Sequence, residues 1–314
     1  MLNLNEIWNY ERCNCNRISI KDFKQVTAVS NISLNVRKGE IYGFLGLNGA
    51  GKTTTIRMLL GMINPSGGNA FINGKKISSG STAIWKEVGY LVEIPYAYPD
   101  LTVRENLEIV RRLRFLTDNK AVDDIIDKLK LTKYSNFKTK TLSLGNAQRL
   151  GLAKALIHNP SVLIIDEPSN GLDPAGMLEI RELLSDLALN QDVTVFISSH
   201  ILGEISKFTS RIGIIHEGEL IQELNTNKLE ELCQKRLILE TSNNNKAIEL
   251  LIANDFESEQ LVESQIAISS NNAIVKPSTV ANLIVSNGLE LNSLHIVEED
   301  LESYFLRVVK SQNN

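Results

Sequence analysis

The sequence predicts an α/β fold in which a parallel sheet carries a helical insertion, followed by a small α+β domain. Short apolar segments typical of buried strands alternate with helical patterns through residues 17–220. A helical block at about 100–157 interrupts that alternation. Beyond residue 220 the periodic patterns weaken and the charge balance changes sign. These three observations define both the fold class and its division into domains.

Charge and length place the domain boundaries. Residues 221–314 hold 7 Lys and Arg against 14 Asp and Glu, a net charge of −7, whereas residues 1–220 hold 26 against 23, a net of +3. A chain of 314 residues suits one domain of about 200 residues plus a smaller one. We therefore expect an N-terminal extension over residues 1–16, a main domain over 17–220 and an acidic accessory domain over 221–314.

Composition excludes several classes of protein. The net charge of −4 argues against nucleic acid as a partner. No apolar run approaches the ~20 residues of a membrane helix, and the polar N-terminal residues do not resemble a signal peptide. Cys13, Cys15 and Cys233 are interpreted as reduced thiols, because Cys13 and Cys15 are too close for a usual zinc pair. We expect any membrane connection to come through a partner.

The expected elements follow from periodicity and capping. Thr102 and Glu105 match a capping box, and Asp173 can cap a helix that begins at Pro174. In the main domain, strands are expected at 17–21, 28–36, 41–45, 162–165, 193–198 and 211–215, and helices at 54–62, 121–131, 147–157 and 201–210, as well as after residues 102 and 173. In the accessory domain, strands are expected at 237–240, 265–269 and 273–275, and helices at 246–254, 280–287 and 298–309.

Residues 46–53, GLNGAGKT, fit the pattern G-x-x-x-x-G-K-[ST] between a predicted strand and a predicted helix. Glycines allow backbone N–H groups to turn inward and hold phosphate oxygens, and the helix N-terminus adds partial positive charge. A chance glycine-rich turn is the alternative, which the flanking elements disfavour. We expect ATP to bind here, with Lys52 on the β- and γ-phosphates and Thr53 on Mg²⁺. The candidate binding residues are Gly46, Leu47, Asn48, Gly49, Ala50, Gly51, Lys52, Thr53 and Thr54.

Two acids end the apolar segment 162–165. Such a strand delivers Asp166 and Glu167 to the edge of the sheet where parallel α/β folds bind ligands. Asp166 is a candidate Mg²⁺ ligand, and Glu167 is a candidate general base for an attacking water. Taken alone, a strand that ends in Asp-Glu is more often a simple turn. The phosphate loop makes the functional interpretation the better one.

Two further segments point to the same chemistry. His200 ends the predicted strand at 193–198 and can contact a γ-phosphate, whereas the three other histidines, His158, His216 and His295, are interpreted as structural. Ser143 and Gly145, in LSLGN, precede a predicted helix and can form a second anion site at its N-terminus. One nucleotide does not need two γ-phosphate sites in one chain. We therefore expect two chains to face head to tail, each completing the other's site.

In this order, the motifs resemble those of the ATP-binding subunits of ABC transporters. GLNGAGKTT resembles Walker A, LSLGNAQRL the signature region, VLIIDEP Walker B, SNGLDP the D-loop and SSH the switch histidine. The resemblance covers about residues 17–220 and implies the P-loop NTPase fold of ABC ATPases, with a helical subdomain at about 94–157. It further implies that Phe23 stacks on adenine, although a core position is the alternative, and that Asp173 contacts the facing chain.

Three residues depart from the family pattern. Asn146 stands where the signature usually has glutamine, and Leu144 replaces a glycine. Glu93 stands in place of the usual Q-loop glutamine, which reaches Mg²⁺ or the attacking water and senses the membrane partner. A carboxylate can still bind Mg²⁺, so Glu93 is a candidate metal ligand and catalytic residue that alters turnover. In isolation it would be interpreted as a solvated charge at a strand end.

Glu93, a single ATP-binding domain and the C-terminal EEDLESYFLRVV resemble the ATPases of bacitracin-resistance and lantibiotic-immunity exporters. The resemblance implies an ATPase at the cytoplasmic face of the membrane, working as a homodimer or a pair of ATPase subunits with a separate permease to export an antimicrobial peptide. Two alternatives remain open: a soluble ABC ATPase that acts on ribosomes or DNA, and a subunit of an importer. The absence of a second ATP-binding domain and of a heptad run disfavours the soluble class.

Overall fold

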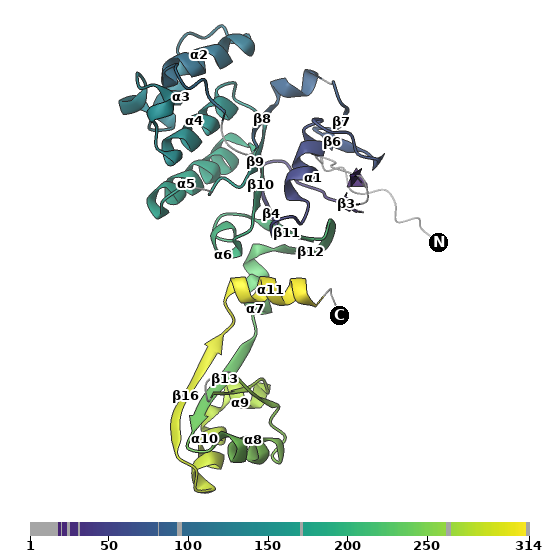
Figure 1. Cartoon of the computed structure of the whole chain (residues 1–314), viewed down its shortest axis with the longest axis vertical. Coiled ribbons are helices and arrows are strands. Elements are labelled where there is room, and N and C mark those ends of the chain that lie inside the picture. The colour runs from purple at the N-terminus through teal and green to yellow at the C-terminus, as the bar shows by residue number, and fades with distance from the viewer. Residues whose placement is uncertain are drawn as a thin grey trace, which may run out of the picture. The chain divides into compact units, whose positions relative to one another are not determined.

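The computed structural model describes residues 18–19, 21–23, 26–30, 32–80, 82–92, 96–169, 172–261 and 265–311. They form two compact units divided between Asn227 and Lys228. We expected the boundary near residue 220, which is seven residues before the observed one and lies inside strand β12 (Glu219–Asn225). Figure 1 shows the elements of each unit.

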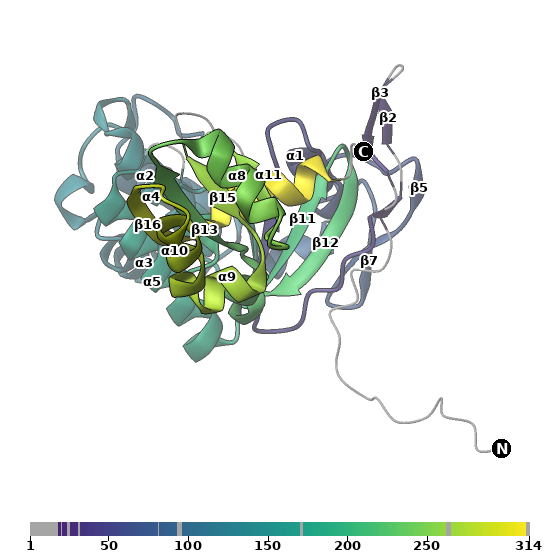
Figure 2. The ribbon, with the colours of Figure 1, turned by 90° about the horizontal axis from the view of Figure 1, so that it is seen from below.

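The first unit is built on a six-stranded sheet with the order β12-β11-β4-β10-β9-β8. Its inner strands run parallel, and only β12 is antiparallel to its neighbour β11, beside which it curves along the edge of the sheet (Figure 2). This confirms the predicted parallel α/β sheet. The strands of the unit are β1 (Ile18–Ser19), β2 (Lys21–Phe23), β3 (Val26–Val29), β4 (Ile41–Leu45), β5 (Gly67–Gly68), β6 (Ala70–Ile72), β7 (Lys75–Ile77), β8 (Val88–Leu91), β9 (Val162–Asp166), β10 (Thr194–Ser199), β11 (Arg211–His216) and β12.

Helices cover both faces of this sheet (Figure 1). Helix α1 contacts β9 from one side, and α5 contacts β4 and β10 from the other. Every residue of β4, β9 and β10 is buried, as expected for strands covered on both faces. The helices of the unit are α1 (Lys52–Leu59), α2 (Val103–Leu113), α3 (Ala121–Lys128), α4 (Leu144–Leu156), α5 (Pro174–Gln191) and α6 (Leu202–Ile205), and the 3-10 turns are η1 (Ala83–Lys86), η2 (Thr132–Tyr134) and η3 (Thr139–Thr141).

Capping explains where two of these helices begin. The Thr102 hydroxyl accepts a hydrogen bond from Glu105 N at 3.1 Å, and the Glu105 carboxylate accepts one from Thr102 N at 2.7 Å, which confirms the capping box of α2. The predicted helix at 147–157 begins three residues earlier, because Ser143 caps α4 through Asn146 N. The strand expected at 28–36 was wrong beyond Val29, where β3 ends.

The second unit is an antiparallel four-stranded sheet with the order β14-β15-β13-β16 and helices α8, α9 and α10 on one face (Figure 1). Leu237, Leu239 and Leu251 are fully buried between sheet and helices. Its elements are α7 (Leu229–Leu232), β13 (Lys235–Thr241), α8 (Asn244–Ile252), β14 (Ser258–Gln260), β15 (Ile266–Ile268), α9 (Asn271–Val275), α10 (Pro277–Ser286), β16 (Leu291–Glu298) and α11 (Leu301–Lys310), after the short turn η4 (Thr226–Lys228).

One expectation in this unit was wrong. The segment 273–275 was expected to be a strand, but it lies in helix α9. Ala273 is fully buried against the core of the unit, and the Ala273 N–H donates to the Ser270 carbonyl. A three-residue apolar run has no periodicity of its own, so packing against the sheet decides its conformation.

Candidate functional site

The phosphate loop joins β4 to α1 and depends on two glycines with positive φ. Gly49 has φ 84° and Gly51 has φ 105°, conformations that other residues rarely adopt. A Cβ on Gly51 would lie 2.6 Å from the Ala28 carbonyl oxygen, so no larger residue fits. Gly51 is also the N-cap of α1, and the predicted helix start at 54 therefore moves back to Lys52. The loop accordingly presents its N–H groups beside a helix N-terminus.

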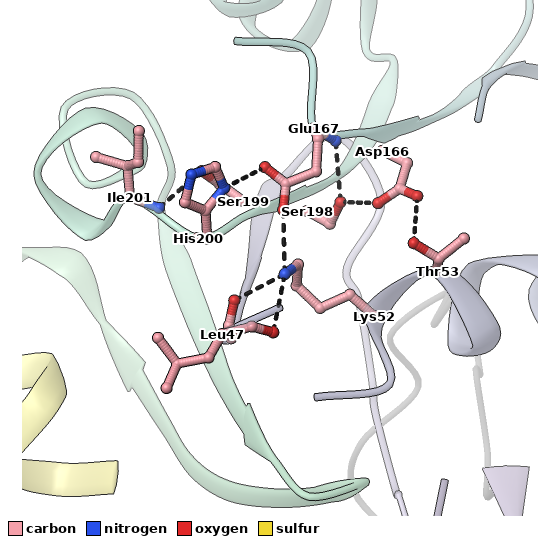
Figure 3. A network of polar contacts seen from close by, with 10 residues as sticks. Leu47, Lys52, Thr53, Asp166, Glu167, Ser198, Ser199, His200 and Ile201 are labelled. Carbon is pink, nitrogen blue, oxygen red and sulfur yellow. Dashed lines mark hydrogen bonds and ion pairs between the residues drawn. The ribbon is translucent and has the colours of Figure 1, made fainter. Parts of the chain in front are cut away.

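Lys52 is the buried cation of this loop, with 6% of its surface exposed. Its ammonium donates to the Gly46 carbonyl at 2.7 Å and to the Leu47 carbonyl at 3.3 Å. The Lys52 Nζ also lies 3.0 Å from Glu167 Oε1 (Figure 3). A buried ammonium needs such partners, since burying an unpaired charge is costly. The predicted phosphate lysine and the predicted general base are therefore direct neighbours.

The other predicted loop residues occupy the rim of this site. Leu47, Asn48 and Gly49 are all exposed. Ala50 is buried, and its carbonyl accepts a hydrogen bond from Gly218 N at 2.9 Å. Thr54 is half-buried in the first turn of α1. The loop is thus fixed to the rest of the unit at Ala50 and exposed to solvent at Asn48 and Gly49.

The three neighbouring strands β4, β10 and β9 end together at this edge. Ser199 of β10 pairs with Leu45 of β4, and Ser198 pairs with Asp166 of β9. Since the strands are parallel, their carboxyl ends bring the phosphate loop, Asp166 and His200 to one edge, as parallel α/β sheets do at their ligand sites. The expected juxtaposition of these three motifs is present in the geometry.

Asp166 is the centre of a short chain of hydroxyl contacts. Its Oδ2 accepts a hydrogen bond from Thr53 Oγ1 at 2.7 Å, and its Oδ1 accepts one from the Ser198 hydroxyl. Asp166 is 4% exposed, so both oxygens are held by these partners rather than by bulk water. A carboxylate and a hydroxyl side by side offer the hard oxygen ligands that Mg²⁺ prefers. No cluster of three or more metal-binding side chains occurs among the described residues.

Glu167 has an unusual backbone for a non-glycine residue, with φ 50°. Its N–H donates to the Ser198 side-chain and main-chain oxygens at 3.1 and 3.2 Å, and these bonds fix the conformation. Its carboxylate lies between a lysine and a histidine. Oε1 contacts the Lys52 ammonium, and Oε2 lies 2.7 Å from His200 Nδ1 (Figure 3). Left-handed backbone at a position with such partners is typical of functional sites.

Ser198 is the functional residue that sequence reasoning missed. It is fully buried, and it connects Asp166 to the backbone of Glu167. A serine in an otherwise apolar strand that leads directly to His200 was the available signal. Ser199 plays a local part, because its hydroxyl accepts a hydrogen bond from Ile201 N at 3.0 Å and so orients the segment after His200.

Ser143, Gly145 and Asp173 lie at the N-termini of α4 and α5, and their described polar contacts stay within those helix ends. The Ser143 hydroxyl accepts from Asn146 N at 3.3 Å and from Asn146 Nδ2 at 3.1 Å. Asp173 caps α5 by accepting from Gly176 N at 2.9 Å. Leu144, next to Ser143, is 56% exposed. These residues form a surface feature that is separate from the Lys52 network.

Helix α4 is anchored at the end away from Ser143. A Cβ on Gly89 of β8 would lie 2.2 Å from the Ala155 carbonyl, so helix and strand are in close contact. His158 Nε2 lies 3.1 Å from the Val88 carbonyl, and burial, together with the nearby Arg114 charge, lowers the pKa of His158 to about 4. A neutral imidazole that donates to a backbone carbonyl is a structural role, which agrees with its interpretation from the sequence.

Lys154 and Asn106 connect α4 and α2 to the segment that follows residue 95. The Lys154 ammonium donates to the Tyr96 carbonyl at 2.7 Å, and burial lowers its pKa. The buried Asn106 amide binds Tyr98 N and O at 2.9 and 3.2 Å. Glu93 itself lies outside the described residues, as does the side chain of Phe23, which ends β2. Their predicted roles stay predictions.

Comparison with known proteins agrees with these motifs. Residues 29–170 match the family described as ABC transporter. The bacitracin transport ATP-binding protein BcrA of Bacillus licheniformis is 40% identical, over 90% of this chain and 92% of that protein. The lantibiotic transport ATP-binding protein SrtF of Streptococcus pyogenes is 33% identical, over 70% of this chain and 95% of that protein.

Solved structures support the fold. A dimeric ATP-binding cassette bound to ADP and phosphate superposes with a TM-score of 0.62 at 23% identity, covering 68% of this chain and 98% of that one. At that identity the likeness establishes the fold alone, and it confirms the P-loop ATPase architecture expected from the motifs. Across the part of the chain that the structure describes, the helices are too short or too polar to cross a membrane.

Proposed function

This chain belongs to the ABC transporter family as an ATP-binding subunit, and from that premise we propose that it drives the export of an antimicrobial peptide through a separate membrane permease. The chain is an ATPase, as members of this family are. What we propose beyond the family is the assignment of residues, the paired arrangement of chains, the location at the cytoplasmic face of the membrane and the class of substrate.

One observation carries the residue assignments. Glu167 is held between Lys52 and His200, and Asp166, which precedes it in the chain, accepts a hydrogen bond from Thr53. The phosphate loop with Lys52 would bind the ATP phosphates, and Thr53 and Asp166 would hold Mg²⁺, which neutralises phosphate charge when bound. Glu167 orients and deprotonates the attacking water, while His200 holds the Glu167 carboxylate in place and reaches toward the γ-phosphate. Glu93 is proposed as a further Mg²⁺ ligand from its sequence position alone.

The separation of Ser143 from this network supports a site shared by two copies of the chain. Ser143 and Gly145 of one copy would contact the γ-phosphate held by the other, with Asp173 beside them. Isologous pairing of two identical chains would create two such sites at once. The exposed position of Leu144 agrees with a surface that meets a partner.

A permease would contact the helical block. Tyr96 and Tyr98 are 75% and 48% exposed, and their rings pack edge to face with centroids 5.8 Å apart. Exposed aromatic residues on an anchored segment are typical of protein interfaces. Through Lys154 and Asn106 this segment is fixed to α4 and α2, so a force on it reaches the helix that carries Ser143.

The substrate class is inferred from the relatives. Both BcrA and SrtF are named as transport proteins, for bacitracin and for a lantibiotic, and the match to BcrA covers 90% of this chain, so it reaches into the second unit. We propose a peptide antibiotic of this kind as the substrate. An importer, or a soluble ABC ATPase that acts on ribosomes or DNA, is the competing function.

The test is a gentle pull-down of the tagged chain from native membranes, followed by a resistance assay. We expect a multi-helix membrane protein to co-purify after detergent extraction. Co-expression with that protein should raise the tolerated concentration of bacitracin or a lantibiotic in a sensitive strain, and Glu167→Gln should abolish the gain. Glu182→Gln, an equivalent change at an exposed site on α5, should keep it. Recovery with ribosomes, or without any membrane partner, would overturn the export proposal.

A further inference from the structure

Helices α4 and α5 are joined at two points, and the first lies at their N-terminal ends. The Leu172 side chain packs between two glycines. A Cβ on Gly145 of α4 would lie 3.3 Å from Leu172 Cδ2, and one on Gly176 of α5 would lie 3.4 Å from it. Gly145 and Gly176 each lie within three residues of their helix's N-cap, Ser143 and Asp173. The two helix ends therefore lie side by side.

The second point is an ion pair farther along both helices. Arg149 of α4 pairs with Glu179 Oε2 of α5, and their side chains are only 19% and 33% exposed. Glu179 Oε1 also lies 3.1 Å from the ammonium of Lys130, which follows α3 and is 64% exposed. The Arg149 contact is an ion pair without a hydrogen bond, because Glu179 Oε2 is buried and has no hydrogen-bond partner among the described residues, whereas the Lys130 ammonium donates a hydrogen bond to Glu179 Oε1. Solvent and salt screen a shielded ion pair less than an exposed one, so the tie to α4 is the less screened of the two.

The two contacts keep the N-terminal ends of α4 and α5 aligned along their helix axes. Arg149 lies six residues beyond Ser143, and Glu179 lies six residues beyond Asp173. Six helical residues span about 9 Å, so each partner of the ion pair is the same distance along its helix from the N-cap. Helix α4 is also held at its C-terminal end by the close contact of Ala155 with Gly89 of β8. The ion pair adds a tie to α5 between that end and the Leu172 contact, and so limits sideways movement of α4 against α5.

We propose that Glu179 is a positioning residue for the paired state: through Arg149 it holds Ser143 in register with Asp173, so that both helix ends meet a second copy of the chain together. This inference rests on the proposed function, in which those two residues face the partner copy. Surfaces held in their bound arrangement lose less freedom on association and bind more tightly. Glu179 would thus act on pairing, and not on the binding of nucleotide to the single chain.

The experiment compares pairing with nucleotide affinity in the full-length chain carrying Glu167→Gln, which we expect to trap the ATP-bound pair. Sedimentation would follow pairing against ATP concentration, and equilibrium dialysis would give the affinity for ADP. We expect Glu179→Gln to raise the ATP concentration for half-maximal pairing about 10-fold, a size typical of coupled charged contacts. ADP affinity should stay within about twofold, since the contacts of Lys52 are unchanged.

Two control variants separate positioning from general damage. Glu182→Gln removes the same charge one turn farther along α5 at an exposed position, and it should change neither quantity. Lys130→Gln removes the other ion pair of Glu179 without touching α4, and it should shift pairing by no more than about twofold. Arg149→Gln should match Glu179→Gln, and the double variant should be no worse than either, because both remove one contact.

The outcomes separate this inference from the proposed function. If the Glu167→Gln chain does not pair with ATP at all, the shared site of the proposed function is wrong and the inference falls with it. If that chain pairs and Glu179→Gln pairs equally well, the inference alone is overturned. A parallel loss of ADP affinity and pairing would show that Glu179 only maintains the fold, and this too would overturn it.

Discussion

The edge of the sheet around Asp166 and the N-terminal end of α4 around Ser143 carry two parts of one proposed site, yet they are built differently. At the sheet edge, Lys52 and Asp166 are almost fully buried, and each contacts a segment distant in sequence, Lys52 through Glu167 and Asp166 through Thr53. At α4, the Ser143 hydroxyl contacts Asn146 of the same helix end, three residues away, and Leu144 beside it is exposed. One part of the site is fixed within the chain, whereas the other is displayed on its surface. This contrast is what a site completed by a second chain requires.

The largest expected effect is at the sheet edge. Glu167→Gln keeps the shape and the contact with Lys52 but removes the basic carboxylate. Loss of a general base typically costs about 10²–10⁴-fold in rate, so phosphate release should fall by that amount while ATP binding persists. Single-turnover hydrolysis and nucleotide binding measured on the same preparation would check this. Hydrolysis at the parent rate would show that Glu167 is not the base.

A mixing experiment sharpens the comparison between the two regions. Lys52→Ala damages the sheet edge and Ser143→Ala damages the α4 end, and each alone should lower hydrolysis by about 10²-fold. Random pairing of the two variants yields half mixed pairs, each with one intact site, so the mixture should regain about a quarter of parent activity. The measurement is steady-state phosphate release from equimolar mixtures. If mixing restores nothing, the two regions do not act across two chains.

His158, just beyond the C-terminal end of α4, gives a pH-dependent prediction. The pKa of His158 is lowered from 6.5 to about 4, so between these values the unfolded chain binds a proton that the folded chain excludes. Stability from this group is therefore present above pH 6.5 and is lost as the pH falls toward 4. Between pH 7 and 5 the loss should be about 1–2 kcal/mol, allowing for partial exposure.

His158→Gln should remove that dependence. Urea unfolding at pH 7 and pH 5 would measure it, with the parent chain as reference. The variant should lose about 1–2 kcal/mol less than the parent between the two pH values. An identical loss in both chains would mean that His158 is protonated in the fold and that it does not link α4 to β8 in the neutral form.

The smallest effect is expected at Asn146. Its short amide binds the Ser143 hydroxyl at 3.1 Å and occupies a hydrogen bond that a phosphate would otherwise take. Asn146→Gln supplies the longer amide usual at this position and should raise hydrolysis at limiting ATP about two- to threefold. The ATP dependence of initial rates would test this, with Asn272→Gln, the same change at an exposed position of α9 in the second unit, as the control. A decrease would show that Asn146 supports Ser143 rather than competing for it.

Sequence was sufficient for the sheet edge because motif and local geometry coincide there. Lys52 follows the phosphate loop, and Asp166, Glu167 and His200 lie at the ends of buried strands that are fixed by parallel pairing. The sequence was insufficient where contacts between distant segments determine the role or the conformation of a residue. Ser198 looked like any strand residue, and only the register with Asp166 reveals its role. The segment 273–275 became helical through burial of Ala273, which three residues of pattern cannot convey.

The hydroxyl of Ser198 has one further consequence. It is shared by the Asp166 carboxylate and the Glu167 amide, two groups assigned to different tasks. A substitution of Ser198 would therefore change both the position of the proposed Mg²⁺ ligand and the position of the proposed base. Neither the affinity for Mg²⁺ nor the activity of the base can be altered separately through this residue. Variation in turnover among related chains should accordingly arise outside this strand, at positions such as Asn146, where a change leaves the Ser198 contacts intact.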